Sequence, residues 1–151
     1  NIPILPLKGQ LLRVFPANHQ LSCILFHNNS YVAPKPNGTI LMGTTEENVG
    51  FDKEVTTEGR QRILEAGLLL APNLQGAREQ YAIAGLRPIT PDGMPIIGPV
   101  SEVEGLYVAT GHGRKGILLS AATGKIMADL ILRDASDLPY ENFLPQRFRA
   151  D

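Results

Sequence analysis

Residues 111–116 have the sequence Gly111-His112-Gly113-Arg114-Lys115-Gly116, and this stretch, here called the glycine turn, decides how the end of the chain folds. The apolar run 105–110 before it predicts a strand, and the apolar run 117–132 after it predicts a helix. A G-x-G-x-x-G pattern between a strand and a helix is typical of turns that place a phosphate or cofactor at a helix N-terminus. We therefore expect the glycine turn to face a cofactor.

The sequence after this helix argues against a complete dinucleotide-binding fold. Such a fold needs a second parallel strand after the helix, with an acidic residue near its end. Here residues 134–139 are Asp-Ala-Ser-Asp-Leu-Pro, and a polar tail follows. No second strand fits, so we expect another stretch of polypeptide to hold the cofactor.

The predicted last helix is apolar on nearly all sides. Its polar residues form one thin stripe, Lys125, Asp129 and Arg133. Such a helix is usually buried on several sides, and the few strands expected here cover only one of them. The chain also begins at Asn1 rather than at a methionine. Both features predict a piece of a longer protein.

The region upstream predicts an antiparallel sheet with a helix packed on it. Asn37-Gly38 supplies the positive φ angles of a tight hairpin turn. Pro34 and Pro36 predict that the hairpin lies at a sheet edge or that its pairing ends early, because proline donates no ladder hydrogen bond. Thr56-Thr57-Glu58 is typical of a helix start. The predicted elements are strands 9–15, 21–26 and 81–87, a hairpin of 31–34 with 39–43, and a helix over 57–71.

These elements define the expected fold class, α+β. We predict a mainly antiparallel sheet with one packed helix in residues 1–90. Residues 91–151 supply a C-terminal strand, turn and helix that belong to a cofactor-binding half largely absent from the chain.

The composition describes a globular chain. Its 151 residues are 43% apolar and 19% charged, with 14 basic and 15 acidic side chains and a net charge of −1. This balance recommends neither nucleic acid nor an anionic membrane as a partner, and no apolar run is long enough to span a bilayer. The one cysteine, Cys23, lies in an apolar run and is expected to be a buried reduced thiol. That expectation fits a cytoplasmic protein.

Two side chains are candidates for binding a small ligand. Arg87 ends an apolar strand, and its guanidinium can bind a carboxylate through two charge-assisted hydrogen bonds. The alternative is a structural ion pair with an acid such as Asp92. Tyr31 begins a strand beside a polar turn, so that its hydroxyl can reach a ligand, or it is an ordinary half-buried tyrosine.

The glycine turn contributes three more candidates. His112 is able to act as an acid or base near neutral pH, although a structural role is favoured. Arg114 and Lys115 either attract negative charge at the helix start or are solvated cations. The histidines show no metal-binding spacing, and no nucleophile elbow or phosphate loop is present. Side chains that can bind a ligand, without a complete set of catalytic residues, are typical of flavin or nicotinamide enzymes.

Four segments resemble the C-terminal part of the D-amino-acid-oxidase-like flavoproteins, and most of all the bacterial glycine oxidases of thiamine biosynthesis. The most specific is Gly85-Leu86-Arg87-Pro88 followed by residues 92–98, Asp-Gly-Met-Pro-Ile-Ile-Gly. The others are Pro6-Leu7-Lys8-Gly9-Gln10, then Tyr31-Val32-Ala33-Pro34 with Gly43-Thr44-Thr45-Glu46, and the glycine turn with the helix start.

The resemblance implies an FAD cofactor and a small amino-acid substrate, with the sheet of residues 1–90 as the substrate-binding domain and residues 91–151 completing the FAD-binding domain. Arg87 would bind the substrate carboxylate, Tyr31 would assist it, and Arg114 would lie near the substrate or the flavin. The implied flavin-lining residues are Gly111, His112, Gly113, Arg114, Lys115, Gly116, Ile117 and Leu118. The implied reaction transfers hydride from the α-carbon to the flavin, after which the imine is hydrolysed and oxygen gives hydrogen peroxide; no catalytic side-chain base is required.

The family's N-terminal FAD-binding segment is missing, so we expect the chain alone to bind FAD weakly or not at all and to be inactive. The alternatives are a piece of a sarcosine-type or D-amino-acid dehydrogenase, and a non-enzymatic α+β binding module. The expected partners are the amino-acid substrate, the missing segment and a second copy in a homo-oligomer.

Overall fold

The computed structural model describes residues 2–17 and 21–149, which form two compact units. The first, here called the sheet unit, is Lys8–Leu86. The second, here called the turn unit, contains the residues up to Leu7 and those from Arg87 onward. The chain therefore divides inside strand β5 (Arg78–Ile89), a few residues before the boundary at residue 90 that the sequence suggested. The functional roles assigned to the two parts remain predictions.

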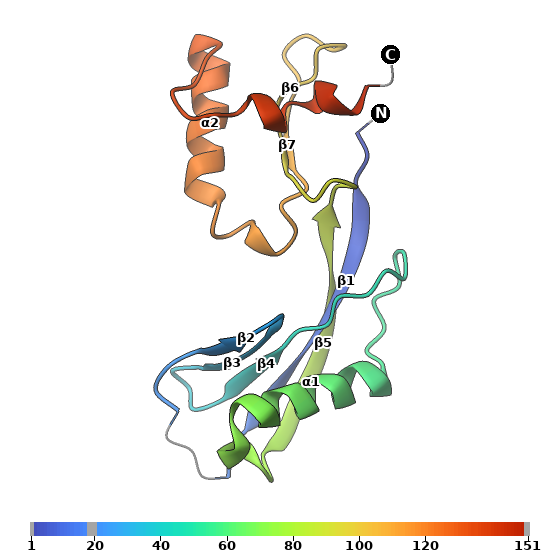
Figure 1. Ribbon diagram of the computed structural model, residues 1–151, viewed down its shortest axis with the longest axis vertical. Coiled ribbons are helices and arrows are strands. Elements are labelled where there is room, and N and C mark those ends of the chain that lie inside the picture. Colours follow the sequence, from blue (N-terminus) through green and yellow to red (C-terminus); the bar gives the residue numbers. More distant parts are fainter. Residues whose placement is uncertain (1, 18–20, 150–151) are drawn as a thin grey trace. The chain divides into compact units, whose positions relative to one another are not determined.

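The sheet unit is built on a five-stranded sheet with the strand order β2-β3-β4-β1-β5 (Figure 1). The new strands are β1 (Leu5–Phe15), β2 (Leu25–His27), β3 (Ser30–Pro34) and β4 (Ile40–Gly43). The pairs β2–β3, β3–β4 and β1–β4 are antiparallel, as the sequence predicted. Gly38 adopts a φ of +78° in the hairpin between β3 and β4. This is the left-handed conformation that the Asn37-Gly38 pair predicts for a tight turn.

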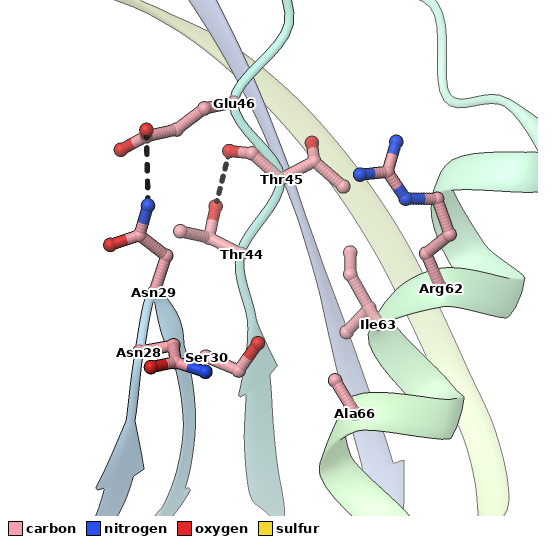
Figure 2. A pocket seen from close by; sticks show the side chains of 9 residues that line it. All are labelled: Asn28, Asn29, Ser30, Thr44, Thr45, Glu46, Arg62, Ile63 and Ala66. Carbon is pink, nitrogen blue, oxygen red and sulfur yellow. Dashed lines mark hydrogen bonds between the residues drawn. The ribbon is translucent and has the colours of Figure 1, made fainter.

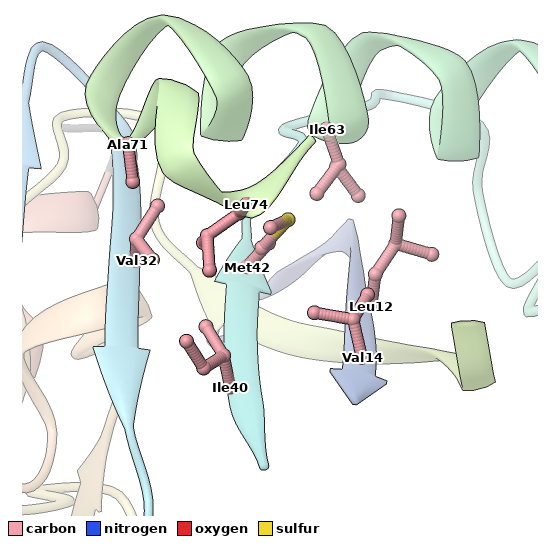
Figure 3. Close-up of a cluster of buried hydrophobic side chains, with 8 residues drawn as sticks. All are labelled: Leu12, Val14, Val32, Ile40, Met42, Ile63, Ala71 and Leu74. Atoms are coloured by element: carbon pink, nitrogen blue, oxygen red, sulfur yellow. The ribbon is translucent and has the colours of Figure 1, made fainter. Parts of the chain in front are cut away.

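Helix α1 (Thr57–Leu70) packs on β3 and β4, close to the predicted span of 57–71. It begins where expected, because the Thr56 hydroxyl accepts a hydrogen bond from the Gly59 amide. At Gly67 a Cβ would lie 2.7 Å from the Met42 sulfur, so glycine there lets the helix approach the sheet. Figure 3 shows the core between helix and sheet, which consists of Leu12, Val14, Val32, Ile40, Met42, Ile63, Ala71 and Leu74.

Two expectations for the sheet unit are wrong, one about a strand and one about Cys23. The predicted strand 21–26 is shorter, because Leu25 pairs with Val32 and the same register would bring Cys23 opposite Pro34, which has no amide hydrogen. Of the two alternatives for the hairpin, an early end is observed: β2 pairs with β3, so the hairpin is not at the edge, and the β3–β4 pairing stops at Pro34. Cys23 is exposed rather than buried, because it lies before the paired part of β2.

The turn unit contains a two-stranded antiparallel sheet and one α-helix. Strand β6 (Ile96–Pro99) pairs with β7 (Tyr107–Thr110), and α2 (Ser120–Arg133) packs on β6. Its buried cluster consists of Ile97, Ile126 and Leu130. Short 3-10 helices complete the described fold: η1 (Pro72–Leu74) in the sheet unit, and η2 (Gly113–Lys115), η3 (Glu141–Phe143) and η4 (Pro145–Phe148) in the turn unit.

Helix α2 differs from its prediction at both its start and its surface. It begins at Ser120, because residues 116–119 form turns instead of regular helix. Ile117 and Leu132 are 93% and 80% exposed. The apolar sides for which the sequence predicts burial are therefore uncovered in this unit. Within the described part of the chain, no helix has the length and apolar character needed to cross a membrane.

The polar stripe of α2 is an ion-pair network. Asp129 is buried and accepts hydrogen bonds from Lys125 (Nζ–Oδ2 2.5 Å), Arg133 and Ser136. The hydrogen bond from Lys125, reinforced by the one from Arg133, lowers the pKa of Asp129 to about 2. Burying a carboxylate in this way requires such partners.

Candidate functional site

The end of β5 lies against the glycine turn inside the turn unit. Ile89 forms a β-bridge with His112, and a Cβ placed on Gly113 would be 3.3 Å from Ile89 Cγ2. Arg87 precedes Ile89 by two residues on the same strand, so the two side chains leave β5 on the same face. The structure thus brings the predicted carboxylate-binding arginine and the predicted cofactor turn to one place.

Glycine is required at two positions of this turn. Gly111 and Gly113 have φ angles of +79° and +54°, in the left-handed region that favours glycine. At Gly111 a Cβ would also lie 2.7 Å from Thr90 Cγ2, so the turn packs directly on the residue that follows β5. The backbone is therefore held tightly at the start of the turn.

His112 ties the turn to helix α2. Its Nε2 lies 3.0 Å from the Thr123 hydroxyl, and burial lowers the pKa of the imidazole. A neutral histidine bonded to a helix residue fits the structural role that the sequence favoured. The assignment of His112 to the cofactor-binding set stays a prediction.

The outer part of the turn combines positive charge with exposed apolar surface. Arg114 and Lys115 are exposed cations on η2, and after Gly116 come Ile117 and Leu118, which are 93% and 81% exposed. A flavin ring is flat and apolar and gains negative charge when it is reduced, so an apolar surface beside cations suits it. The residues present therefore fit the cofactor that the sequence predicts.

Asp92, the acid named as an alternative partner of Arg87, forms its ion pair with Arg147. Arg147 Nε lies 2.7 Å from Asp92 Oδ2. Hydrogen bonding from Arg147 holds the pKa of this carboxyl well below its usual range. The acid after β5 is therefore engaged by the C-terminal tail.

Tyr31 belongs to the sheet unit. It pairs with Gly43 in the β3–β4 ladder, and a Cβ on Gly43 would lie 2.8 Å from the Tyr31 hydroxyl oxygen, so the tyrosine ring lies across this glycine. The next residue, Val32, is in the core under α1. Because side chains alternate along a strand, Tyr31 lies on the face of the sheet opposite α1.

A buried polar cluster fixes the segment that follows Gly43. Lys8 and Gln10 are each only 1% exposed. Lys8 Nζ bonds Asp52 Oδ2 at 2.8 Å, and the amide nitrogen of Gln10 donates to Glu47 Oε1 at 2.7 Å and to Thr56 Oγ1 at 3.0 Å. The Gln10 backbone amide also donates to the Thr45 hydroxyl at 2.9 Å. This cluster joins β1, the segment after β4 and the start of α1.

The cluster keeps its ionic groups charged. The hydrogen bond to Asp52 raises the pKa of Lys8, and the same contact lowers the pKa of Asp52. Burial acts to raise the pKa of Glu47, but hydrogen bonds from Thr45 and Gln10 and the charge of Lys8 outweigh it, so the net direction is downward. Charged, hydrogen-bonded groups of this kind stabilise a fold when all their partners are present.

A polar pocket of about 440 Å³ opens beside α1 (Figure 2). Its lining residues are Asn28, Asn29, Ser30, Thr44, Thr45, Glu46, Arg62, Ile63 and Ala66. Ser30 shares the core-facing side of β3 with Val32, whereas Tyr31 points to the opposite face. This pocket is therefore separate from the predicted substrate residue of the sheet unit.

Sequence reasoning assigned no structural role to several residues that shape these regions, although Gly43 and Lys8 lie in segments that carry the family resemblance. Gly43 follows from the hairpin register, since a turn at Asn37-Gly38 places it opposite Tyr31. The buried Lys8 gave no signal, because a lysine in an amphipathic strand normally marks the solvent face. Arg147 gave none either, since the tail has no periodic pattern that relates it to Asp92.

Comparison with known proteins assigns the chain to a family. Residues 1–130 match the DAO family, described as FAD dependent oxidoreductase. The chain belongs to this family of FAD-dependent oxidoreductases. FAD is the cofactor of the family, and the expectation of a flavoenzyme relationship is confirmed.

Relatives of this oxidoreductase chain agree with the assignment. It is 39% identical over 150 residues to hydrogen cyanide synthase subunit HcnC of Pseudomonas aeruginosa, covering 99% of this chain and 36% of the relative. It is 37% identical over 130 residues to glycine oxidase of the same organism, covering 86% of this chain and 36% of the relative. The chain thus spans about a third of the length of these curated relatives.

The fold of the oxidoreductase chain also matches a solved structure. The crystal structure of glycine oxidase from Geobacillus kaustophilus superposes with a TM-score of 0.90 at 33% identity, covering 99% of this chain and 41% of the other. The mixed α and β architecture with antiparallel sheets is therefore confirmed. A non-enzymatic binding module, the third possibility raised by the sequence, is not supported by this family membership.

Proposed function

We propose that this chain forms the substrate-binding part and the cofactor-closing turn of an FAD-dependent amino-acid oxidase. The substrate is glycine or another small neutral amino acid, and the products are the 2-oxo acid, ammonia and hydrogen peroxide. The observation that carries this proposal is the meeting of β5 and the glycine turn, where Ile89 pairs with His112 two residues beyond Arg87. The likeness to glycine oxidase supports the same substrate class.

Each predicted site residue has a defined task in this reaction. Arg87 binds the substrate carboxylate through its guanidinium and fixes the direction of the α-carbon. Tyr31 assists that binding with its hydroxyl, and Arg114 supplies positive charge near the reacting centre. FAD, when bound, supplies the two-electron acceptor for the hydride of the α-carbon. Water then hydrolyses the imine, and oxygen takes up the two electrons to give peroxide.

The cofactor-facing part of the proposal assigns the backbone and side chains of Gly111, His112, Gly113, Arg114, Lys115, Gly116, Ile117 and Leu118 to the flavin. Support comes from the left-handed turn, which presents this backbone, and from the exposed Ile117 and Leu118 beside two cations. The remaining binding energy would come from an N-terminal segment that this chain does not contain. We therefore expect the 151-residue chain alone to be inactive.

Substitution of Arg87 tests the substrate role directly. In the full-length protein, Arg87→Ala is expected to raise the KM for glycine by about 10- to 150-fold, because a charge-assisted hydrogen-bonded contact is worth about 1.5–3 kcal/mol. Arg78→Ala is the matched control. Arg78 is an arginine on the same strand, but its guanidinium carbon lies 5.4 Å from the centre of the Phe15 ring, so its contact is with that ring. An unchanged KM in the Arg87 variant removes this residue from the site.

The flavin absorbance of the purified 151-residue chain tests the division of labour. Absence of stoichiometric flavin is expected, and its presence contradicts the proposal. The genomic sequence upstream of Asn1 gives a second check. A strand followed by G-x-G-x-x-G roughly 200 residues earlier, the length of an ordinary domain, is expected.

Two related activities are alternatives within the same family. A sarcosine-type or D-amino-acid dehydrogenase would use Arg87 in the same way and differ in the electron acceptor. A cyanide-forming enzyme is favoured by the 39% identity to hydrogen cyanide synthase subunit HcnC. Measuring peroxide, cyanide and reduction of an artificial acceptor in one assay with glycine and sarcosine separates the three.

A further inference from the structure

The C-terminal tail forms hydrogen bonds with the turn between β5 and β6. Arg147 Nε donates to Asp92 Oδ2 at 2.7 Å, and Arg147 Nη2 donates to Asp92 Oδ1 at 3.3 Å and to the Met94 carbonyl at 2.7 Å. Its Nη1 donates to the Phe143 carbonyl at 2.9 Å, and the guanidinium lies 4.3 Å from the Phe148 ring centre. A half-buried arginine that makes this many contacts fixes the relative positions of its partners and also balances their charge.

The turn that Arg147 grips is in direct contact with the glycine turn. The Met94 carbonyl accepts a second hydrogen bond, from the Thr90 hydroxyl at 2.7 Å, and Thr90 is only 3% exposed. The methyl carbon of Thr90 is the atom that would lie 2.7 Å from a Cβ on Gly111. Contacts therefore run without a gap from Arg147 through Met94 and Thr90 to the first residue of the glycine turn.

The same tail also contacts β6, which pairs with the strand that leads into the glycine turn. A Cβ on Gly98, in β6, would lie 2.7 Å from Leu144 Cδ2. Gly98 has a φ of +138°, and β6 pairs with β7, which ends immediately before Gly111. The tail thus contacts both connections that place the glycine turn, and it lies beyond the residues 1–130 that match the family.

We propose that Arg147 is a positioning residue for the cofactor turn: by clamping Asp92 and Met94 it holds Thr90 against Gly111 and sets the glycine turn to receive the flavin. This role rests on the proposed function and extends it to a residue of the tail. Loss of the clamp frees the Thr90–Gly111 contact to shift. Because flavin binding requires a preformed turn, that freedom weakens binding without removing any flavin contact.

The first experiment measures FAD binding in the full-length protein. Apoprotein is titrated with FAD, with quenching of flavin fluorescence as the signal. Arg147→Gln is expected to raise the Kd for FAD by about tenfold, because the loosened glycine turn must be ordered when the flavin binds. It is also expected to alter the visible absorbance spectrum of the bound flavin. Arg147→Lys, which keeps the charge but loses the two-pronged geometry, is expected to fall between wild type and Arg147→Gln.

Arg149→Gln is the matched control. Arg149 belongs to the same tail and also pairs with an acid, Glu102, but both side chains are about half exposed, and the hydrogen bonds of Arg149 go to Glu102 and Ser101. Its Kd for FAD is expected to stay within about twofold of wild type, as for most surface ion pairs. Equal weakening by both variants overturns the proposal, because it would show a general effect of the tail.

Hydrogen exchange of the apoprotein gives a readout that needs neither flavin nor substrate. In Arg147→Gln, the amides of residues 111–118 are expected to exchange faster, whereas those of α1 keep the wild-type rate. Unchanged exchange at 111–118 overturns the positioning role, and faster exchange throughout the protein shows a merely structural one. A wild-type protein that binds no FAD contradicts the proposed function instead, while the exchange data still decide the role of Arg147.

Discussion

The two units of the chain differ in the size of their buried apolar clusters. In the sheet unit, α1 covers a cluster in which Val32, Ile40 and Met42 have no exposed surface at all. In the turn unit the buried cluster is Ile97, Ile126 and Leu130, while Ile117, Leu118 and Leu132 are at least 80% exposed. The sheet unit thus has the larger core, and the turn unit relies more on polar contacts, while both units expose some apolar side chains, among them Phe51 and Leu69 of the sheet unit.

This difference matches the tasks proposed for the two units. A unit that carries Tyr31 on a rigid sheet needs its own core to hold the hydroxyl in place. A unit that closes over a cofactor needs an uncovered apolar surface to meet it. The polar contacts of Asp129 and Arg147 then maintain the geometry that a small hydrophobic cluster would maintain only weakly.

The largest effect is expected in the core of the sheet unit. Ile40→Ala should lower the free energy of unfolding by about 2–5 kcal/mol, because it removes a buried side chain and leaves a cavity. Leu132→Ala, at a position 80% exposed, should change it by less than about 0.5 kcal/mol. Urea unfolding of the 151-residue chain measures both. Comparable losses would show that the two units do not differ in packing.

Two helical glycines provide a second contrast, with opposite signs. A Cβ on Gly59 of α1 would lie 2.2 Å from the amide nitrogen of Gln10, which Glu47 and Thr56 hold in place, so Gly59→Ala should destabilise by about 1–3 kcal/mol. Gly124 of α2 has open space around it, and Gly124→Ala should stabilise by about 0.5–1 kcal/mol. Thermal unfolding of both variants checks the signs. Stabilisation by Gly59→Ala would mean that the polar cluster around Gln10 yields easily.

The sequence predicted local elements better than the contacts between them. The turn at Asn37-Gly38, the cap at Thr56 and the apolar runs of β5 and β7 depend on nearby residues, so pattern reasoning found them. The exposure of Cys23 depends on where the β2–β3 pairing stops. The first turn of α2 depends on how Gly111 and Gly113 direct the backbone, and that also is set by tertiary structure.

The candidate site shows the same limit. Arg87 and the glycine turn were recognised from their residue types and from the family resemblance, but only the fold shows that Ile89 joins them. The partner of Asp92 lies 55 residues away in a tail without a hydrophobic pattern. No local rule connects Arg147 to a turn so distant in sequence, and the same is true of Lys8 and Asp52.

Acid should weaken the turn unit through Asp129. Its pKa is about 2 in the folded chain against an ordinary value of 3.8, so the folded state favours the charged carboxylate. A depressed folded pKa gives stabilisation that is complete above about pH 4 and is lost as the pH falls toward 2. Asp129→Asn should therefore be less stable than wild type at pH 7 and lose less between pH 4 and 2. Circular dichroism across this range measures the loss, and parallel curves for the two proteins would exclude Asp129 as its source.

The smallest effect on the isolated chain is expected at Leu118, and it tests the open surface of the turn unit. Leu118 is 81% exposed, so Leu118→Ser removes almost no packing and should shift the unfolding free energy of the 151-residue chain by less than about 0.5 kcal/mol. In the full-length protein the same change should weaken FAD binding by about tenfold or more, because burying a leucine side chain is worth about 1.5–3 kcal/mol. Leu132→Ser, at an 80% exposed position of α2 outside the glycine turn, is the control for the loss of an exposed leucine side chain. Clear destabilisation of the isolated chain by Leu118→Ser would show that this side chain is already packed, and an unchanged Kd for FAD would show that its apolar surface meets something other than the cofactor.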